Sequence, residues 1–310
     1  MKENKLTGKW PSLTKNGEII SAKKSGGKMS KDELMILAPI GYVRCPYKKT
    51  NDIPIKRGIS RIEILDEYMP GLKGLMSSSH AIILGYLHLA NRDTLEASLR
   101  PGEGENEAKG IFSVRSAARP NPIGFTVVKL LDIKNGIVTV EGLDFIDRTP
   151  IIDIKPYSPG WDSIYNATRV RRVSFHEMEP EKALDILIRD AKNFSGKLDN
   201  EGLMVVAIVF LLATKYHIDP RDPELRMEIN RYGIALDALI GMCGATFGSG
   251  RIKVLDWPPK FLTCRFYWKD VNLIMKVEGN KRISGDLTPE EAETLIRIRE
   301  ESFRRQHHCN

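Results

Sequence analysis

The chain has 310 residues, of which 42% are hydrophobic and 28% charged, and its formal net charge is +7. This length suggests two domains, and the apolar fraction is sufficient for ordinary packed cores. The modest basic excess favours an anionic partner, most often RNA, although a soluble protein can also simply be basic.

The sequence contains no segment typical of membrane or secreted proteins. Its longest apolar run, residues 203–213, is too short to span a bilayer and predicts a buried helix. The N-terminus has no apolar signal-peptide core. The four cysteines, Cys45, Cys243, Cys264 and Cys309, show neither the spacing of a zinc or redox motif nor a disulfide framework. We therefore expect a cytoplasmic protein.

Residues 1–36 form the first predicted region. The first 29 residues contain seven lysines against two glutamates and few residues that could build a core. Such a composition predicts a disordered basic arm. The arm either touches RNA phosphates or is only a solvated tail.

Residues 37–172 show the pattern of an all-β domain. Short apolar runs are separated by tight turns, and Asn135-Gly136 between two such runs is the strongest hairpin signal. Residues 91–109 are polar and are expected to be a loop. Since closing a sheet removes its edges, we predict a single-sheet β-barrel.

Residues 173–310 show a different pattern, that of an α+β domain. The last predicted helix has Thr288 and Glu291 in capping-box positions, with Pro289 in the first helical position. Helical periodicity covers residues 179–194, 200–216, 222–242 and 288–308, and strands are expected within residues 250–279.

The stretch "VRSAARPNPIGFTVVKL" (114–130) places a rigid corner in front of a strand. Pro120 and Pro122 fix two backbone angles and hold Asn121 extended. Gly124 allows either a positive φ or a close backbone approach. The corner could present Asn121 and nearby arginines to a ligand. The alternative is a rigid turn whose arginines lie in solvent.

A second stretch, "GLDFIDRTPIIDIKPY" (142–157), is rich in acidic residues. Asp144, Asp147 and Asp153 could face a cation at the ends of strands. Asp147 could equally begin a simple Asx-turn, and Asp153 could form only an ion pair with Lys155, two residues away on the same strand face.

Together, "RSAARPNPIG" and "DRTPIIDIKPY" resemble the TrmO family, also called the YaeB or TsaA-like family, over roughly residues 38–165. This resemblance implies a single β-barrel that uses S-adenosylmethionine to methylate the N6 nitrogen of threonylcarbamoyladenosine at tRNA position 37. It also implies a homodimer with its site near the subunit interface. The sequence departs from the family at Ala117, where proline is usual, and at Arg148, where glycine is usual. It also departs at Pro54-Ile55-Lys56, where Pro-Arg-Gln is usual.

The resemblance also assigns site residues. The proton acceptor is left open among His88, Asp147, Asp153 and Tyr157, and His88 could also be an ordinary strand-end histidine. Arg119 and Lys155 are expected to bind the anionic substrate. The expected cofactor contacts are Ile55, Lys56, His88, Leu89, Arg115, Asn121, Phe125, Gly142, Leu143 and Asp144.

Two alternatives to this function remain. One is a cofactor- or RNA-binding regulator without turnover, and the other is a methyltransferase for a different acceptor. The C-terminal segment "IGMCGATFGSGRIKV" (240–254) weakly resembles the E-subunit-like domains of formylmethanofuran dehydrogenase, but their metal-binding cluster is not evident. We therefore expect no metal, a buried structural Cys243, and a role in RNA binding or dimerisation.

Overall fold

The structure of the chain is a computed structural model. The residues that it describes are 12–13, 19–20, 37–54, 57–97, 109–165, 167, 173–255, 261–277, 282–283 and 286–300. They form two compact units, and the division between the units falls at residues 169–170.

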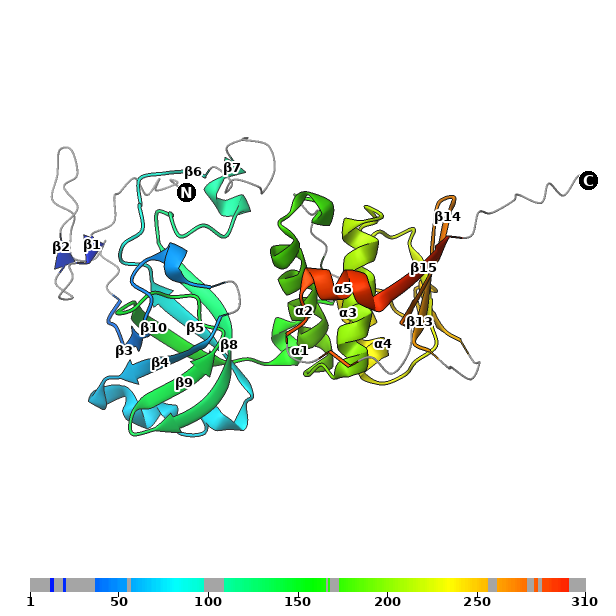
Figure 1. The fold of residues 1–310 in the computed structure, drawn as a ribbon. Coiled ribbons are helices and arrows are strands. Elements are labelled where there is room, and N and C mark those ends of the chain that lie inside the picture. The colour runs from blue at the N-terminus through cyan, green and yellow to red at the C-terminus, as the bar shows by residue number, and fades with distance from the viewer. Residues whose placement is uncertain are drawn as a thin grey trace, which may run out of the picture. The chain divides into compact units, whose positions relative to one another are not determined.

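The first unit is a closed antiparallel barrel, as predicted (Figure 1). Along β4 and β8 exposed and buried residues alternate, so that one face of each strand fills the barrel. Around the barrel the order is β10 (Pro150–Pro156), β3 (Gly41–Arg44), β4 (Ile59–Ile64), β9 (Ile137–Glu141), β8 (Ile123–Lys134) and β5 (His80–Tyr86).

The predicted hairpin joins β8 to β9. Asn135 and Gly136 both have positive φ, 50° and 74°. Two left-handed residues in succession give a turn whose twist matches that of the flanking strands. The Asn-Gly prediction is confirmed.

Short elements lie outside the barrel strands. In the predicted loop 91–109, β6 (Glu96–Ala97) pairs with β7 (Lys109–Gly110), so this segment is not wholly irregular. In the predicted arm, β1 (Ser12–Leu13) pairs with β2 (Ile19–Ile20), and the rest of residues 1–36 lies outside the described residues. The short helices of this unit are η2 (Thr50–Asp52), η3 (Asp66–Leu72), η4 (Leu75–Ser77), η5 (Ile111–Ser113) and α1 (Pro159–Asp162), whereas η6 (Phe175–Glu177) belongs to the second unit.

The second unit packs helices against a five-stranded sheet, which confirms the α+β prediction. The helices are α2 (Pro180–Ser195), α3 (Asn200–Thr214), α4 (Ile234–Cys243) and α5 (Pro289–Leu295). The sheet order is β12 (Ile252–Val254), β11 (Arg226–Ile229), β13 (Thr263–Trp268), β14 (Val271–Val277) and β15 (Ile296–Glu300).

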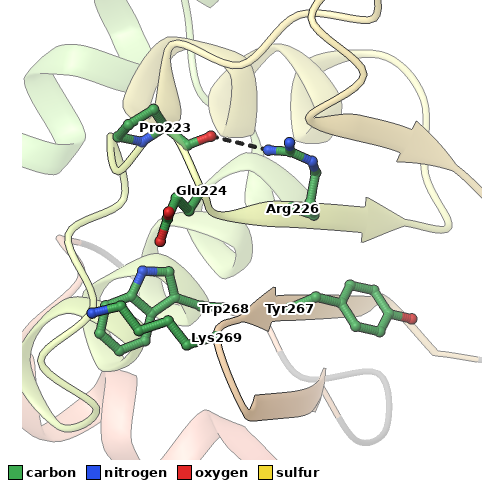
Figure 2. Close-up of a pocket in the computed structure, with 6 residues that line it drawn as sticks. All are labelled: Pro223, Glu224, Arg226, Tyr267, Trp268 and Lys269. Carbon is green, nitrogen blue, oxygen red and sulfur yellow. Dashed lines mark hydrogen bonds between the residues drawn. The ribbon is translucent and has the colours of Figure 1, made fainter.

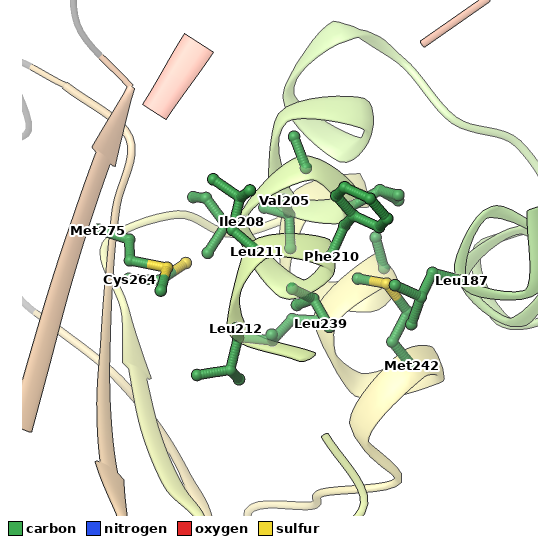
Figure 3. Close-up of a cluster of buried hydrophobic side chains, with 14 of the residues drawn as sticks. Leu187, Val205, Ile208, Phe210, Leu211, Leu212, Leu239, Met242, Cys264 and Met275 are labelled. Atoms are coloured by element: carbon green, nitrogen blue, oxygen red, sulfur yellow. The ribbon is translucent and has the colours of Figure 1, made fainter. Parts of the chain in front are cut away.

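Helix α3 lies at the centre of this unit. It buries almost its whole circumference, as the apolar run predicts. Figure 3 shows Ile208 and Leu211 of α3 near Cys264 and Met275 of the sheet. Within the described part of the chain, no helix combines the length and hydrophobicity needed to cross a membrane.

Two helix predictions in this unit are wrong in part. Residues 226–229, predicted within a helix, form β11, and residues 296–300, predicted within the last helix, form β15. "RMEI" and "IRIRE" alternate polar and apolar residues, and pairing with distant strands decides in favour of that period. The predicted start of the last helix is confirmed, because Thr288 Oγ1 accepts a hydrogen bond from Glu291 N (3.2 Å).

Cys243 closes α4 and is fully buried, as expected. Burial raises the pKa of its thiol to about 12, although Arg251 and Arg221 partly oppose the shift. The thiol is therefore neutral and serves as a small core side chain. The resemblance of this region to the E-subunit-like domains of formylmethanofuran dehydrogenase stays a prediction.

Candidate functional site

One rim of the barrel collects the segments that carry the predicted site. Pairing places the end of β3 beside the start of β4, and the end of β5 beside the starts of β8 and β10. The connections that meet there span residues 45–58, 87–92, 114–122 and 142–149. Most of the predicted residues belong to this rim, although Ile55 and Lys56 lie outside the described residues.

Backbone hydrogen bonds tie the proline corner to the turn after β5. Leu87 N donates to Pro122 O (2.7 Å), and Arg119 N donates to Asn91 O (3.1 Å). Arg92 Nε adds a bond to Pro120 O (3.1 Å). His88 and Leu89, which lie in this turn, are therefore held next to the corner.

Gly124 serves for a close approach, one of the two roles that the sequence allows. A Cβ at Gly124 would lie 2.6 Å from the ring of Phe145 and 2.9 Å from Leu87. Gly85, its cross-strand partner, is equally close to Phe145. The two glycines make room for the buried Phe145 ring, and Phe145 fixes the backbone next to Asp144.

Arg115 and Phe125, both predicted to bind the cofactor, contact each other. The Arg115 guanidinium carbon lies 5.5 Å from the centre of the Phe125 ring. Phe125 is 47% exposed, which is unusual for a phenylalanine in a strand. A cation stacked on an exposed ring offers both charge and flat apolar surface to a ligand.

Arg119 is held by the chain itself. Its guanidinium donates to the carbonyls of Ser116 (3.0 Å) and Ile111 (3.2 Å), and also to that of Val114. The alternative that this arginine lies in solvent is wrong. These acceptors occupy the donors of its Nε and Nη2, and its substrate contact stays a prediction.

Asp144 has one oxygen without a donor among the described residues. Its Oδ2 lies 3.2 Å from Arg57 Nη2, whereas its Oδ1 is buried and accepts no hydrogen bond from them. Gly142 N bonds Gly58 O (3.2 Å), and Leu143 is 1% exposed, so the backbone on the N-terminal side of Asp144 is fixed. A buried carboxylate oxygen in this state is poised for a donor from a ligand.

Arg57 is a site residue that the sequence does not predict. It stands directly after Ile55 and Lys56, in the segment that the family resemblance singles out. The sequence could therefore have pointed to Arg57 only through its place next to Ile55 and Lys56. Its pairing with Asp144 becomes visible only in the fold.

Asp147 is bound inside the rim. Its Oδ1 accepts from Cys45 N (3.2 Å), and its Oδ2 lies 2.6 Å from Lys48 Nζ. Burial alone would raise the pKa of this carboxyl, but the bonds from Lys48 and Cys45 and the charge of Arg44 together lower it. Asp147 is therefore a fixed carboxylate and a poor proton acceptor.

Asp153 lies opposite Leu84, the cross-strand partner of Phe125, whereas Lys155 and Tyr157 lie further from this rim, along β10 and just beyond its end. Asp153 pairs with Lys155 (2.7 Å), which agrees with the ion-pair alternative. The Tyr157 ring lies 6.5 Å from that of His80, and its hydroxyl is 2.8 Å from Ser163 Oγ. The structure therefore separates Lys155 and Tyr157 from the rim, whereas Asp153 stays level with Phe125 and is engaged by Lys155.

Arg148 stands where the resemblance leads us to expect glycine, and its backbone explains that expectation. Its φ is +62°, in the left-handed region that glycine adopts freely. Its N–H donates to Val43 O (2.8 Å), and the next residue, Thr149, is fully buried. The turn therefore has the backbone conformation that glycine would favour, and the backbone of Arg148 is strained in it.

We predict that Arg148→Gly raises the free energy of unfolding by up to about 1 kcal/mol, whereas Arg148→Val lowers it by at least about 1 kcal/mol. The left-handed conformation costs a non-glycine residue about 1–2 kcal/mol, and the greater chain entropy of glycine offsets part of the gain. Thermal unfolding measures both changes. At Arg61, exposed on β4, the order should reverse, since valine favours a strand and glycine weakens it. The same order at both positions would contradict the assignment of strain to Arg148.

Comparisons with known proteins identify what the chain is similar to. Residues 42–163 match the family model described as the tRNA-methyltransferase O N-terminal domain. A probable S-adenosyl-L-methionine-binding protein of Archaeoglobus fulgidus is 32% identical over 262 residues, 80% of this chain and 69% of that protein. An S-adenosyl-L-methionine-binding protein of the same organism is 42% identical over 134 residues, 42% of this chain and 94% of that protein. The human tRNA (adenine(37)-N6)-methyltransferase is 30% identical over 169 residues, 52% of this chain and 37% of that protein.

The first of these matches covers more of the chain than the barrel unit contains, so it extends into the α+β unit. Similarity to this relative therefore includes residues of the α+β unit as well as the barrel. The family match of the barrel and this long match to a relative show that the chain belongs to the TrmO family.

Proposed function

We propose that the chain transfers a methyl group from S-adenosylmethionine to the N6 nitrogen of an adenine in tRNA. The observation that carries this proposal is the buried Asp144 Oδ1, which no donor of the described residues reaches, on a rim shared with Arg115 and Phe125. Family membership adds the reaction class, since relatives are named for binding S-adenosylmethionine and for methylating tRNA.

The residues of the rim fit the cofactor. S-adenosylmethionine carries ribose hydroxyls and an amino group, either of which can donate to Asp144 Oδ1. Its carboxylate suits the Arg115 guanidinium, and its adenine ring suits the exposed face of Phe125. Leu89 and Asn121 are exposed on the same rim and complete the proposed set, together with His88, Gly142 and Leu143.

When bound, the cofactor supplies a methyl group on a positively charged sulfur. The protein then has to align the acceptor nitrogen with that methyl group and exclude water. The nitrogen loses a proton as its bond to carbon forms. We assign this proton to the His88 imidazole, because Asp147 is held by Lys48 and Cys45, Asp153 is paired with Lys155, and Tyr157 lies beyond the far end of β10.

The finer proposal is that the acceptor is threonylcarbamoyladenosine at position 37, next to the anticodon. Its carboxylate calls for a cation. Lys48 and Arg57 belong to the rim, where each already has a carboxylate partner and could accept a second one. An adenine in a loop is also easier to unstack than one in a duplex.

A homodimer and a cytoplasmic location are parts of the same proposal. The outward residues of β8, Ile123, Phe125 and Val127, are 41%, 47% and 39% exposed. A row of exposed apolar residues along one strand is typical of a protein interface. If a second copy covers this row, the Phe125 face of the site lies at the boundary between the two copies.

The test is methyl transfer from radiolabelled S-adenosylmethionine to tRNA with and without the threonylcarbamoyl group, followed by nucleoside analysis. Label only on threonylcarbamoyladenosine is the expected result. Label on unmodified adenosine would retain the enzyme class and change the acceptor. Cofactor binding without transfer to either tRNA would overturn the proposal in favour of a binding protein.

A further inference from the structure

One face of the sheet in the α+β unit is lined with cations. The residues that point to the helices are apolar, among them Met227, Cys264 and Met275, which join the core formed with α3 and α4. Alternate residues therefore point to the opposite face, which we call the outer sheet face. Its residues in the described strands are Arg226, Glu228, Lys253, Thr263, Arg265, Tyr267, Asn272, Ile274, Lys276, Arg297 and Arg299.

Six of these residues are basic and only Glu228 is acidic. Strand pairing sets Arg265 between Glu228 and Ile274, and sets Lys276 directly opposite Arg297. Neighbouring strands are about 4.8 Å apart, so the cations form a dense grid across the sheet. Like charges facing each other destabilise a sheet, so stability alone does not explain this composition.

The single carboxylate of this face is already engaged. Glu228 Oε2 accepts a hydrogen bond from Tyr267 (3.0 Å) and lies 3.7 Å from Arg265 Nη1. The exposed members of the face are the cations Arg226, Lys253, Lys276, Arg297 and Arg299. Counted over its residues in the described strands, the outer sheet face therefore carries six basic side chains against one acidic one, and five of the basic ones are exposed.

The ring of Tyr267 lies at one end of the face, whereas Trp268, the next residue of β13, packs against the core at the same end of the strand. Arg226 and Tyr267 also line a shallow pocket of about 490 Å³, together with Pro223, Glu224, Trp268 and Lys269 (Figure 2). Lys269 Nζ lies 4.2 Å from the centre of the Trp268 ring. Basic side chains next to aromatic rings are the usual makeup of surfaces that bind single-stranded nucleic acid.

We propose that the outer sheet face binds the phosphate backbone of tRNA. The proposal rests on the proposed function, because it assigns to the α+β unit the binding of the same tRNA substrate. Charge complementarity favours a polyanion. The centres of protein interfaces are depleted of charge, and the only large aliphatic side chain of this face, Ile274, is buried, so it offers nothing to insert into a lipid surface.

The experiment compares two double variants of the full chain with equal change in charge. Arg297→Glu/Arg299→Glu reverses two cations of the outer sheet face. Lys192→Glu/Lys197→Glu reverses two exposed lysines at the end of α2 and just beyond it. The dissociation constant for unmodified tRNA is measured without cofactor at several salt concentrations.

We expect the Arg297→Glu/Arg299→Glu variant to bind tRNA at least tenfold more weakly than the wild type. The slope of the logarithm of the binding constant against the logarithm of the salt concentration should fall by about one for each phosphate that is no longer neutralised. The Lys192/Lys197 variant should stay within twofold of the wild type. Equal losses in both variants would show a general charge effect and overturn the proposal, as would unchanged binding in the first. If Arg297→Glu/Arg299→Glu does not fold, Lys253→Gln/Lys276→Gln tests the same face without reversing charge, with the same expected direction.

The outcomes separate this inference from the proposed function. If the wild-type chain binds tRNA through this face but methylates no tRNA, the proposed reaction is wrong and the inference about the outer sheet face stands. If the wild-type chain methylates tRNA and the Arg297→Glu/Arg299→Glu variant binds tRNA normally, the inference about the outer sheet face is wrong and the proposed reaction stands.

Discussion

Asp144→Asn is expected to weaken S-adenosylmethionine binding between tenfold and a hundredfold. Its Oδ1 is buried without a donor from the described residues, and a hydrogen bond to a charged acceptor contributes about 1.5–3 kcal/mol. Asparagine keeps the shape of the side chain and removes its charge. Calorimetric titration of the full chain with the cofactor measures the loss directly and does not depend on knowing the methyl acceptor.

Glu63→Gln is the matched control. Glu63 is also a barrel carboxylate paired with an arginine, Arg44 at 2.6 Å, but it lies on the exposed face of β4. Its neutralisation should leave cofactor affinity unchanged. Since the Asp144–Arg57 pair is itself partly exposed, Asp144→Asn should also change the free energy of unfolding by less than about 1 kcal/mol. Equal affinity of Asp144→Asn and wild type would remove Asp144 from the cofactor site.

The barrel could be predicted because its signals are local. Alternation along β4 and β8 marks the buried face of each strand, and Asn135-Gly136 fixes one hairpin. In contrast, the helical predictions over β11 and β15 are wrong. These short alternating segments fit either period when read alone, and the pairing that decides between the periods involves strands far away in the chain.

The candidate site is predictable by segment and less so by side chain. The motif leads to the rim that holds Arg115 and Asp144, and the role of this rim stays a prediction. It cannot show that Arg119 turns back to bind carbonyls, because its acceptors depend on how the loop closes. It also gives no reason to choose Arg57, whose role depends on the approach of two loops that are distant in sequence.

Gly124→Ala is expected to lower the free energy of unfolding by about 1–3 kcal/mol, the usual cost of adding a methyl group to a packed core. The new Cβ would lie 2.6 Å from Phe145, which is 4% exposed and has little room to move. Calorimetric unfolding measures the change, and Gly71→Ala is the control, because a Cβ at Gly71 meets nothing within 4 Å. A Gly124→Ala chain as stable as the Gly71→Ala chain would contradict the close packing.

A second substitution distinguishes a steric clash from a loss of glycine flexibility. Phe145→Leu removes part of the ring that the new methyl group meets, so in the Gly124→Ala background it should restore about 0.5–3 kcal/mol relative to the sum of the single changes. A purely conformational need for glycine predicts additive effects instead. Since Phe145 adjoins Asp144, the clash should also weaken cofactor binding in Gly124→Ala, and Phe145→Leu should recover part of that affinity. Recovery of stability without recovery of affinity would mean that the ring supports the barrel but does not position Asp144.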